Sequence, residues 1–142
     1  MTVLLDVNLL VSLAWPNHVH HAPATAWFRQ LGEEPWATTP LTETGFVRVS
    51  SNSSAIPAAV SPGAAVGLLA RMRGVPGHRF VPDRVEQVVG SHVDVTRITG
   101  HQQVTDAHLL AIARQSGARL ATFDSGILNL GGSDAVLLIP FS

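Results

Sequence analysis

Four carboxylates stand at points where an apolar segment ends or a helix is expected to begin: Asp6, Glu43, Asp106 and Asp124. They are a large share of the ten acidic residues in the chain. Two carboxylates about 4 Å apart repel each other by about 4 kcal/mol at an effective dielectric constant of about 20. Four acids that converged would therefore need protons, arginines or a bound cation. Since oxygen ligands without cysteine suit Mg²⁺ or Mn²⁺ better than zinc, the candidate chemistry is that of a divalent-cation site.

A parallel sheet would bring these acids to one edge. Asp6 and Asp124 each follow an apolar run of strand length. Glu43 and Asp106 each lie where a helical pattern opens. The carboxyl ends of parallel strands share one sheet edge, which is where ligands bind in open α/β sheets. We therefore expect one cleft to hold all four carboxylates.

Apolar runs and helical spacings alternate along the chain. The expected strands cover residues 3–5, 35–39, 78–82, 119–123 and 135–139. The expected helices cover residues 8–14, 22–31, 40–49, 62–72, 84–89 and 104–115. Residues 52–62, rich in Ser, Ala and Pro, predict a loop that leads into the fourth of these helices, and residues 93–98 are ambiguous. The alternation predicts an α/β fold in which helices cover both faces of a mostly parallel sheet.

Composition indicates one compact domain. The chain has 142 residues, of which 46% are hydrophobic, and its mean hydropathy is +0.25. A chain of this length can bury roughly two-thirds of its unfolded surface. No apolar run approaches the roughly 18 residues of a membrane span, and no basic segment precedes the first apolar run, as a signal peptide requires. Since the chain also lacks cysteine, we expect a cytoplasmic protein without membrane association.

The charged residues narrow the chemistry further. The net charge is −1, so no overall basic field would attract nucleic acid, and any contact with a polyanion must be local. All nine basic residues are arginine. A phosphate-binding Walker A loop requires a lysine and is therefore excluded. Three arginines are candidate contacts for phosphate, although ordinary solvated arginines fit equally well: Arg48, Arg71 and Arg73.

Each acid also has a purely structural alternative. Asp6, or Asn8 two residues later, could cap the helix that follows. Glu43 and Asp106 could complement the dipoles of helix N-termini, a role worth about 0.3–1 kcal/mol. Asp124, which is followed by Ser and Gly, could form an Asx turn. The residues alone leave the structural and the chemical interpretation open.

Four segments resemble the four acidic motifs of PIN-domain ribonucleases and, within that family, those of the VapC-type toxins of bacterial toxin–antitoxin pairs. The segments are LLDVN at residues 4–8, TETGFVR at 42–48, VTDAHL at 104–109 and ATFD at 121–124. Their order, their spacing and the length of the chain agree with the family, so the resemblance covers nearly the whole chain. Residues 52–97 carry no motif and lend it no support.

The resemblance implies a PIN-like three-layer α/β/α sandwich and a metal-dependent endoribonuclease that uses Mg²⁺ or Mn²⁺. It assigns the catalytic and metal-binding centre to four acids: Asp6, Glu43, Asp106 and Asp124. Asp6 and Asp106 would bind the ion directly, and the other two acids would act partly through water. Asn8 and Thr122 resemble the polar residues that orient such ligands. The implied reaction is hydrolysis of an RNA phosphodiester by metal-activated water, without a His or Ser nucleophile.

The same resemblance implies three partners. They are an RNA substrate, a cognate VapB-type antitoxin that covers the acidic cleft, and a second copy of the chain in a homodimer. Single-stranded or loop RNA is expected as the substrate, because unpaired bases can be splayed out and read. No residue identifies the surface that either protein partner would contact.

We expect the histidines after the first helix and the three tryptophans to have structural roles. Three histidines follow the first helix and lack the spacing of zinc ligands, so they predict a solvated loop: His18, His20 and His21. The three tryptophans are expected in the core or in an interface rather than as platforms for base stacking: Trp15, Trp27 and Trp36.

Three rival functions are considered. A phosphatase of the haloacid-dehalogenase type needs Asp-x-Asp and a later lysine, whereas this chain has Asp6-x-Asn8 and no lysine, which makes that class the least favoured. A PIN-fold DNA nuclease would use the same acids, because phosphodiester chemistry at a metal does not itself distinguish the sugars. A non-catalytic binding module could keep the fold without binding divalent ions.

Overall fold

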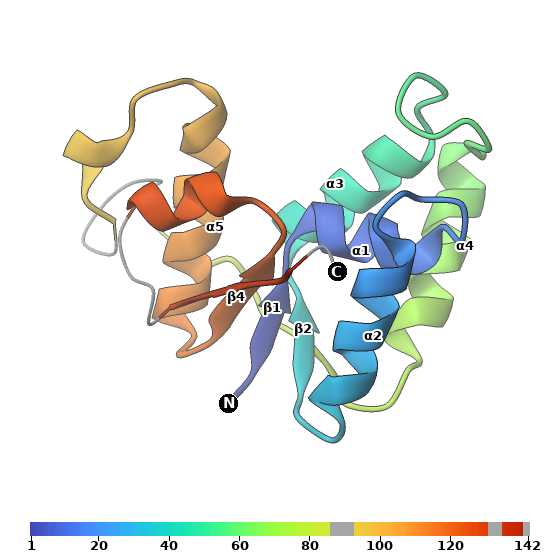
Figure 1. The fold of residues 1–142 in the computed structure, drawn as a ribbon, viewed down its shortest axis with the longest axis horizontal. Helices are drawn as coiled ribbons and strands as arrows, with labels where there is room; N and C mark the ends of the chain where they lie inside the picture. The colour runs from blue at the N-terminus through green and yellow to red at the C-terminus, as the bar shows by residue number, and fades with distance from the viewer. Residues whose placement is uncertain (86–92, 131–134, 141–142) are drawn as a thin grey trace.

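A five-stranded sheet organises the computed structural model, which describes residues 1–85, 93–130 and 135–140. The strands are β1 (Val3–Leu5), β2 (Trp36–Thr38), β3 (His78–Phe80), β4 (Arg119–Thr122) and β5 (Val136–Leu138). Their order across the sheet is β3-β2-β1-β4-β5, and each neighbouring pair is parallel (Figure 1). The carboxyl ends of the strands therefore lie at one edge.

Helices cover both faces of this sheet. They are α1 (Val7–Ala14), α2 (His21–Leu31), α3 (Pro40–Ser50), α4 (Pro62–Arg73) and α5 (Gln102–Gln115), with the short 3-10 helices η1 (Val95–Arg97) and η2 (Ser125–Leu130). Helix α5 packs on one face, and α1 to α4 gather on the other (Figure 1). The predicted three-layer α/β/α sandwich is confirmed.

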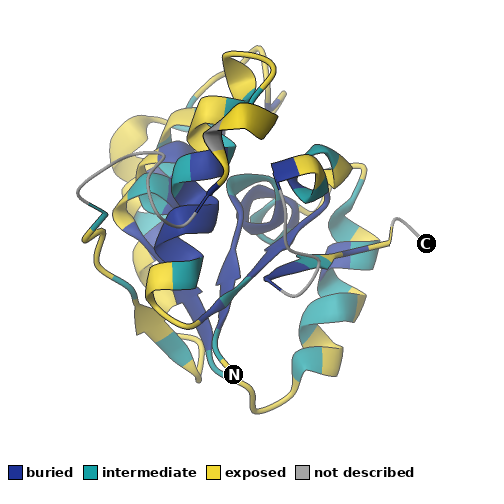
Figure 2. Cartoon of the chain, turned by 90° about the vertical axis from the view of Figure 1, so that its left-hand side faces the viewer, coloured by how far each residue is buried: buried dark blue, intermediate teal, exposed yellow. Residues whose placement is uncertain are grey.

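The central strand shows how the sequence specifies the layers. All three residues of β1 are buried, as expected for a strand covered on both faces. Side chains alternate along a strand, so Val3 and Leu5 join the core on the side of α1 to α4, and Leu4 joins the core under α5. Figure 2 shows these buried strands in dark blue between helices whose outer faces are exposed.

Most predicted elements are confirmed, with boundaries that differ by a few residues. Helix α5 begins at Gln102, before its predicted start at residue 104. The ambiguous residues 93–98 contain the 3-10 helix η1. The predicted helix over residues 84–89 falls mostly outside the described residues. Within the described ranges, no helix is both long and apolar enough to cross a membrane.

The close packing of α1 against α3 depends on a glycine. A Cβ atom placed on Gly45 would lie 2.6 Å from Val7 Cγ2. Valine is branched at Cβ and has one strongly preferred rotamer in a helix, so this methyl group cannot turn away without a cost. The contact between the two helices therefore requires glycine at position 45.

Gly45→Ala is expected to destabilise the protein by about 1–2 kcal/mol, because the cost of overpacking exceeds the gain in helix propensity. Adding Val7→Ala should restore much of this loss. Gly67→Ala in α4 is the matched control, since a Cβ there meets nothing within 4 Å, and it should be neutral or stabilising by up to about 1 kcal/mol. Chemical denaturation measures these differences. Equal effects of the two glycine substitutions would contradict the close approach.

Candidate active site

Asp6 stands between the central strand and the first helix. Its Oδ1 accepts a hydrogen bond of 2.7 Å from Val7 N, so the structural alternative of a helix cap is correct. Its Oδ2 accepts a second bond of 2.7 Å from Thr122 Oγ1, across the sheet edge. Burial raises the pKa of Asp6, these two hydrogen bonds lower it, and the charge of Asp124 raises it further, with a net upward shift. Asp6 is therefore a helix cap whose charged form is disfavoured by burial.

Thr122 joins the strand ends that carry Asp6 and Asp124. Its hydroxyl donates to Asp6, and it accepts from Asp124 N at 3.0 Å and from Asn8 Nδ2 at 3.4 Å. Asn8 Oδ1 in turn accepts from Phe123 N at 3.5 Å. Thr122 is fully buried, so these bonds are shielded from water. Thr122 therefore connects the two acids and orients Asp6, and Asn8 holds Thr122 in place.

Asp106 and Asp124 complete a group of three interacting acids. Asp124 forms an Asx turn, in which its Oδ1 accepts a hydrogen bond of 2.8 Å from Gly126 N. Asp106 lies half-buried in the second turn of α5, so the prediction that it opens this helix is wrong. Burial, followed by the charges of Asp6 and Asp124, raises the pKa of Asp106 to about 6. We call Asp6, Asp106 and Asp124 the aspartate group.

Glu43 has polar partners of its own. It lies in the first turn of α3, as expected. Its Oε2 accepts a hydrogen bond of 2.6 Å from Thr38 Oγ1, at the end of β2. Its Oε1 lies 3.3 Å from Arg73 Nη1, which reaches over from the last turn of α4. The structure thus brings three of the four candidate acids into electrostatic contact and places the fourth in a separate network.

The donor set shows which cation the aspartate group could hold. Among the residues that the structure describes, no three His, Cys, Asp or Glu side chains are spaced as a ready-made metal cage. Mg²⁺ needs no such cage, because it usually binds one or two carboxylates and keeps several water ligands. Asp106 is half-buried, which raises its pKa most, and the charges of Asp6 and Asp124 act on it as well, so a cation would relieve their repulsion. Oxygen donors that repel one another fit a hydrated Mg²⁺ or Mn²⁺ ion.

The three candidate phosphate contacts differ in their surroundings. Arg73 is engaged by Glu43, and its guanidinium lies 5.2 Å from the centre of the Phe80 ring. Arg48 on α3 and Arg71 on α4 are exposed. The last two therefore present charge to solvent, whereas Arg73 is part of the network around Glu43.

Histidines anchor the loop between α1 and α2. His18 Nδ1 accepts a hydrogen bond of 3.0 Å from His20 N, and His21 Nδ1 donates to the carbonyl oxygen of Ser12 at 2.8 Å. The His20 ring lies 5.1 Å from the ring of Phe123, the residue before Asp124. Burial, then the charges of the other two histidines, lowers the pKa of His18. Asn17 and Val19 are exposed, as expected for a solvated loop, but the histidine side chains are half-buried and fasten the loop to its neighbours.

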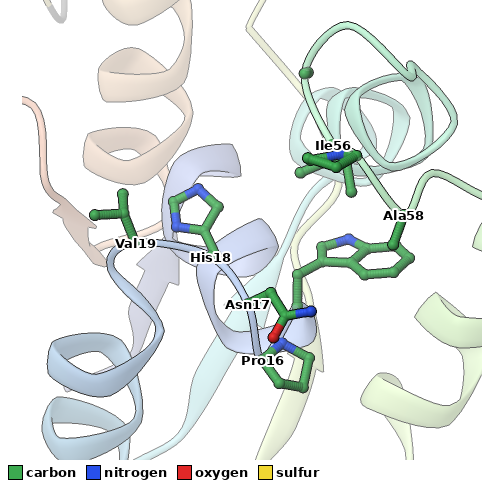
Figure 3. A pocket seen from close by; sticks show the side chains of 9 residues that line it. Pro16, Asn17, His18, Val19, Ile56 and Ala58 are labelled. Carbon is green, nitrogen blue, oxygen red and sulfur yellow. The ribbon is translucent and has the colours of Figure 1, made fainter.

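A hollow of about 270 Å³ lies between this loop and residues 55–58 (Figure 3). Its walls include the side chains of Trp15 and Ile56. His18 is the only ionisable residue that lines it. Since none of the four candidate acids belongs to the hollow, it supplies an apolar surface and not the candidate chemistry.

Sequence reasoning does not single out Thr38 or His78, although both contribute to the network around Glu43. Thr38 is the last residue of β2, as Thr122 is of β4, and both are fully buried. A threonine that ends a buried strand is therefore the signal that could have identified it. No local signal marks His78, because its partner is forty positions away along the chain.

Comparison with known proteins identifies the family. Residues 3–132 match the sequence model of the PIN domain. The chain belongs to the PIN domain family. This PIN domain is 48% identical over 136 residues to ribonuclease VapC39 of Mycobacterium tuberculosis, which covers 96% of the chain and 98% of the relative. It is 51% identical over 127 residues to ribonuclease VapC38 of the same organism, with 89% and 88% covered. It is therefore a VapC-type PIN domain.

A solved structure shows the same fold. The crystal structure of VapC20 of M. tuberculosis, described as a Sarcin-Ricin loop cleaving toxin, superposes with a TM-score of 0.64. The match covers 91% of this PIN domain and 95% of VapC20, at 15% sequence identity. At that identity the likeness concerns the α/β/α fold alone.

Proposed function

We propose that this PIN domain is a metal-dependent endoribonuclease and acts as the toxin of a toxin–antitoxin pair. The observation that carries the proposal is the aspartate group at the carboxyl edge of the sheet, where burial and then the charges of Asp6 and Asp124 raise the pKa of Asp106 to about 6. The two relatives named ribonuclease support the same activity. We further propose that residues 1–142 form a single domain that works in the cytoplasm.

Each polar residue of the edge has a role in this proposal. Asp6 and Asp106 bind Mg²⁺ or Mn²⁺ directly, and Asp124 and Glu43 complete the catalytic centre, acting partly through water. A bound cation supplies positive charge for the scissile phosphate and lowers the pKa of an attacking water molecule. Asn8 and Thr122 keep Asp6 oriented, as the hydrogen-bond partners of metal ligands generally do. The protein therefore needs no histidine or serine nucleophile.

The proposed substrate is unpaired RNA, whose bases can be splayed out against a protein surface. Because the net charge is −1, phosphate contacts must be local. The exposed Arg48 and Arg71 are candidates, and Arg73 would first have to leave Glu43. We propose a VapB-type antitoxin that inhibits the enzyme by covering the acidic edge, and a homodimer as its oligomeric state.

The test is incubation of the purified protein with total bacterial RNA and, separately, with single-stranded DNA, in Mg²⁺, in Mn²⁺ and in EDTA. We expect discrete RNA fragments with either metal and at least a 100-fold loss, about 2.7 kcal/mol of barrier, in EDTA. Mn²⁺ alone should also raise the melting temperature, because it binds the folded state. Cleavage of DNA but not RNA would support a DNA nuclease. Neither cleavage nor a metal-dependent melting shift would support a binding module.

A further inference from the structure

A second polar network is centred on Glu43, at the carboxyl end of β2, the strand next to β1 in the sheet. Thr38 Oγ1 donates to Glu43 Oε2 at 2.6 Å and lies 2.8 Å from His78 Nε2. Arg73 Nη1 approaches the other carboxylate oxygen at 3.3 Å. Thr38 is 0% exposed, and the Glu43 side chain is 16% exposed. Three elements, β2, α3 and α4, therefore meet at one carboxylate, and β3 joins them through the contact of His78 with Thr38.

Counting protons gives the direction of these bonds. The Thr38 hydroxyl has one proton, which it donates to the Glu43 carboxylate. Its oxygen must then accept from His78, so the imidazole carries a proton on Nε2. Hydrogen bonds therefore run from His78 through Thr38 to Glu43. This direction specifies the tautomer of a neutral His78.

Both ends of the network are held by packing. The His78 ring packs edge-on against Trp36, with ring centres 4.7 Å apart. Side chains alternate along a strand, so Trp36 and Thr38 lie on the same face of β2. The His78 ring therefore contacts both of them. At the other end, the Arg73 guanidinium lies 5.2 Å from the centre of the Phe80 ring, a cation–π distance. A change of rotamer at His78 would therefore lose the contact with Trp36, and one at Arg73 would lose the contact with Phe80.

We propose that Thr38 and His78 are positioning residues that hold Glu43 for catalysis, with Arg73 as its counter-charge. The inference rests on the proposed function, in which Glu43 belongs to the catalytic centre. Since both carboxylate oxygens are engaged, Glu43 keeps one orientation beside the aspartate group. It acts there through water and does not turn inward to become a further direct ligand.

Matched substitutions isolate the hydroxyl and the imidazole donor. Thr38→Val keeps the shape of the side chain but removes the hydroxyl, whereas Thr38→Ser keeps the hydroxyl. With a single-stranded RNA oligonucleotide, Thr38→Val should lower kcat by about 10–100-fold, the usual cost of losing such a partner, with little change in KM. Thr38→Ser should retain most of the rate. His78→Phe should follow Thr38→Val, and His78→Gln, which restores a donor near Nε2, should recover part of the loss.

Two readouts distinguish positioning from a general structural role. If Thr38 acts through Glu43, adding Thr38→Val to Glu43→Ala should cause no further loss, either of kcat or of Mn²⁺ affinity measured by calorimetry without RNA. Nitrogen-15 NMR of the metal-free protein should show the Nε2–H tautomer of His78. In Thr38→Val the His78 nitrogen signals should shift, while those of the other histidines stay in place.

Additive losses in the double variant would overturn the proposal. So would equal kcat values for Thr38→Val and Thr38→Ser, or an Nδ1–H tautomer of His78 in the wild type. Failure of the proposed function gives a different result, namely no metal-dependent RNA cleavage by the wild type. In that case the Mn²⁺ affinities and the His78 tautomer still decide whether Thr38 and His78 position Glu43.

Discussion

Asp6→Asn is expected to lower metal-dependent RNA cleavage by about 10³-fold or more, equivalent to about 4 kcal/mol of transition-state stabilisation. The substitution replaces a buried carboxylate that two hydrogen bonds hold at the sheet edge. An amide of the same shape has no charge with which to hold a divalent cation. The loss should therefore appear in kcat, and a saturating concentration of RNA should not restore the rate.

The fold should tolerate this change. Asn Oδ1 can still accept from Val7 N, so the cap of α1 survives. The amide nitrogen that replaces Oδ2 cannot accept the Thr122 proton, so this bond is lost, but burial disfavours the charge of Asp6, so removal of the charge offsets that loss. We expect a melting temperature within a few degrees of the wild type.

Asp94→Asn is the matched control for Asp6→Asn. Asp94 is exposed, pairs with Arg97 at 3.6 Å and lies outside the aspartate group. Its replacement should leave cleavage unchanged. Quantitative cleavage assays and thermal melts of the three proteins, prepared side by side, measure the effects. Wild-type turnover by Asp6→Asn would show that the cleavage comes from a contaminant or that Asp6 has no part in it.

The sequence predicts the aspartate group well because its positions follow from backbone geometry. Buried strands read as apolar runs, parallel pairing aligns their carboxyl ends, and Asp6 and Asp124 follow two adjacent strands, β1 and β4. Asp106 comes close to these two acids if α5 packs over the same edge of the sheet. Each step depends on local patterns, so the error is small: α5 starts early, and Asp106 falls in its second turn.

The surroundings of Glu43 and the histidine loop follow from side-chain contacts between distant segments, which no local pattern records. Glu43 stands at its predicted place in α3, yet Arg73 of α4 engages its carboxylate. His78 reaches Thr38 only because β3 lies beside β2. His21 finds the carbonyl of Ser12 only because the chain turns back after α1. Helix and strand positions are therefore predictable here, whereas the partners of long polar side chains are not.

Asp106→Asn is expected to have two effects of opposite sign, a large loss of cleavage and a gain in stability of the metal-free protein above about pH 6. In the proposed mechanism Asp106 binds the ion directly, so the first effect should again approach 10³-fold, about 4 kcal/mol. The second follows from the crowding of charge in the aspartate group. Burial and the charges of Asp6 and Asp124 raise the pKa of Asp106 from 3.8 to about 6.

The pH range of the stability effect follows from linkage between protonation and folding. Between about pH 4 and pH 6 the folded protein holds a proton on Asp106 that the unfolded chain has lost. The free energy of unfolding of the metal-free wild type should therefore fall as pH rises through this range, and the loss is complete above it. A shift of this size corresponds to about 3 kcal/mol, which partial exposure to solvent reduces to about 1–2 kcal/mol.

Thermal melts of wild type and Asp106→Asn in EDTA, at pH 4 and pH 8, measure this difference. At pH 4 the two should nearly coincide, because Asp106 is largely protonated in the wild type. At pH 8 the variant should melt about 2–8 °C higher. Adding Mg²⁺ at pH 8 should raise the wild type toward the variant and leave the variant nearly unchanged, since only the wild type gains by binding the ion. A variant that is less stable than wild type at pH 8 without metal would contradict the crowding of charge at this edge. The same carboxylate would therefore destabilise the metal-free fold and hold the cation that the reaction requires.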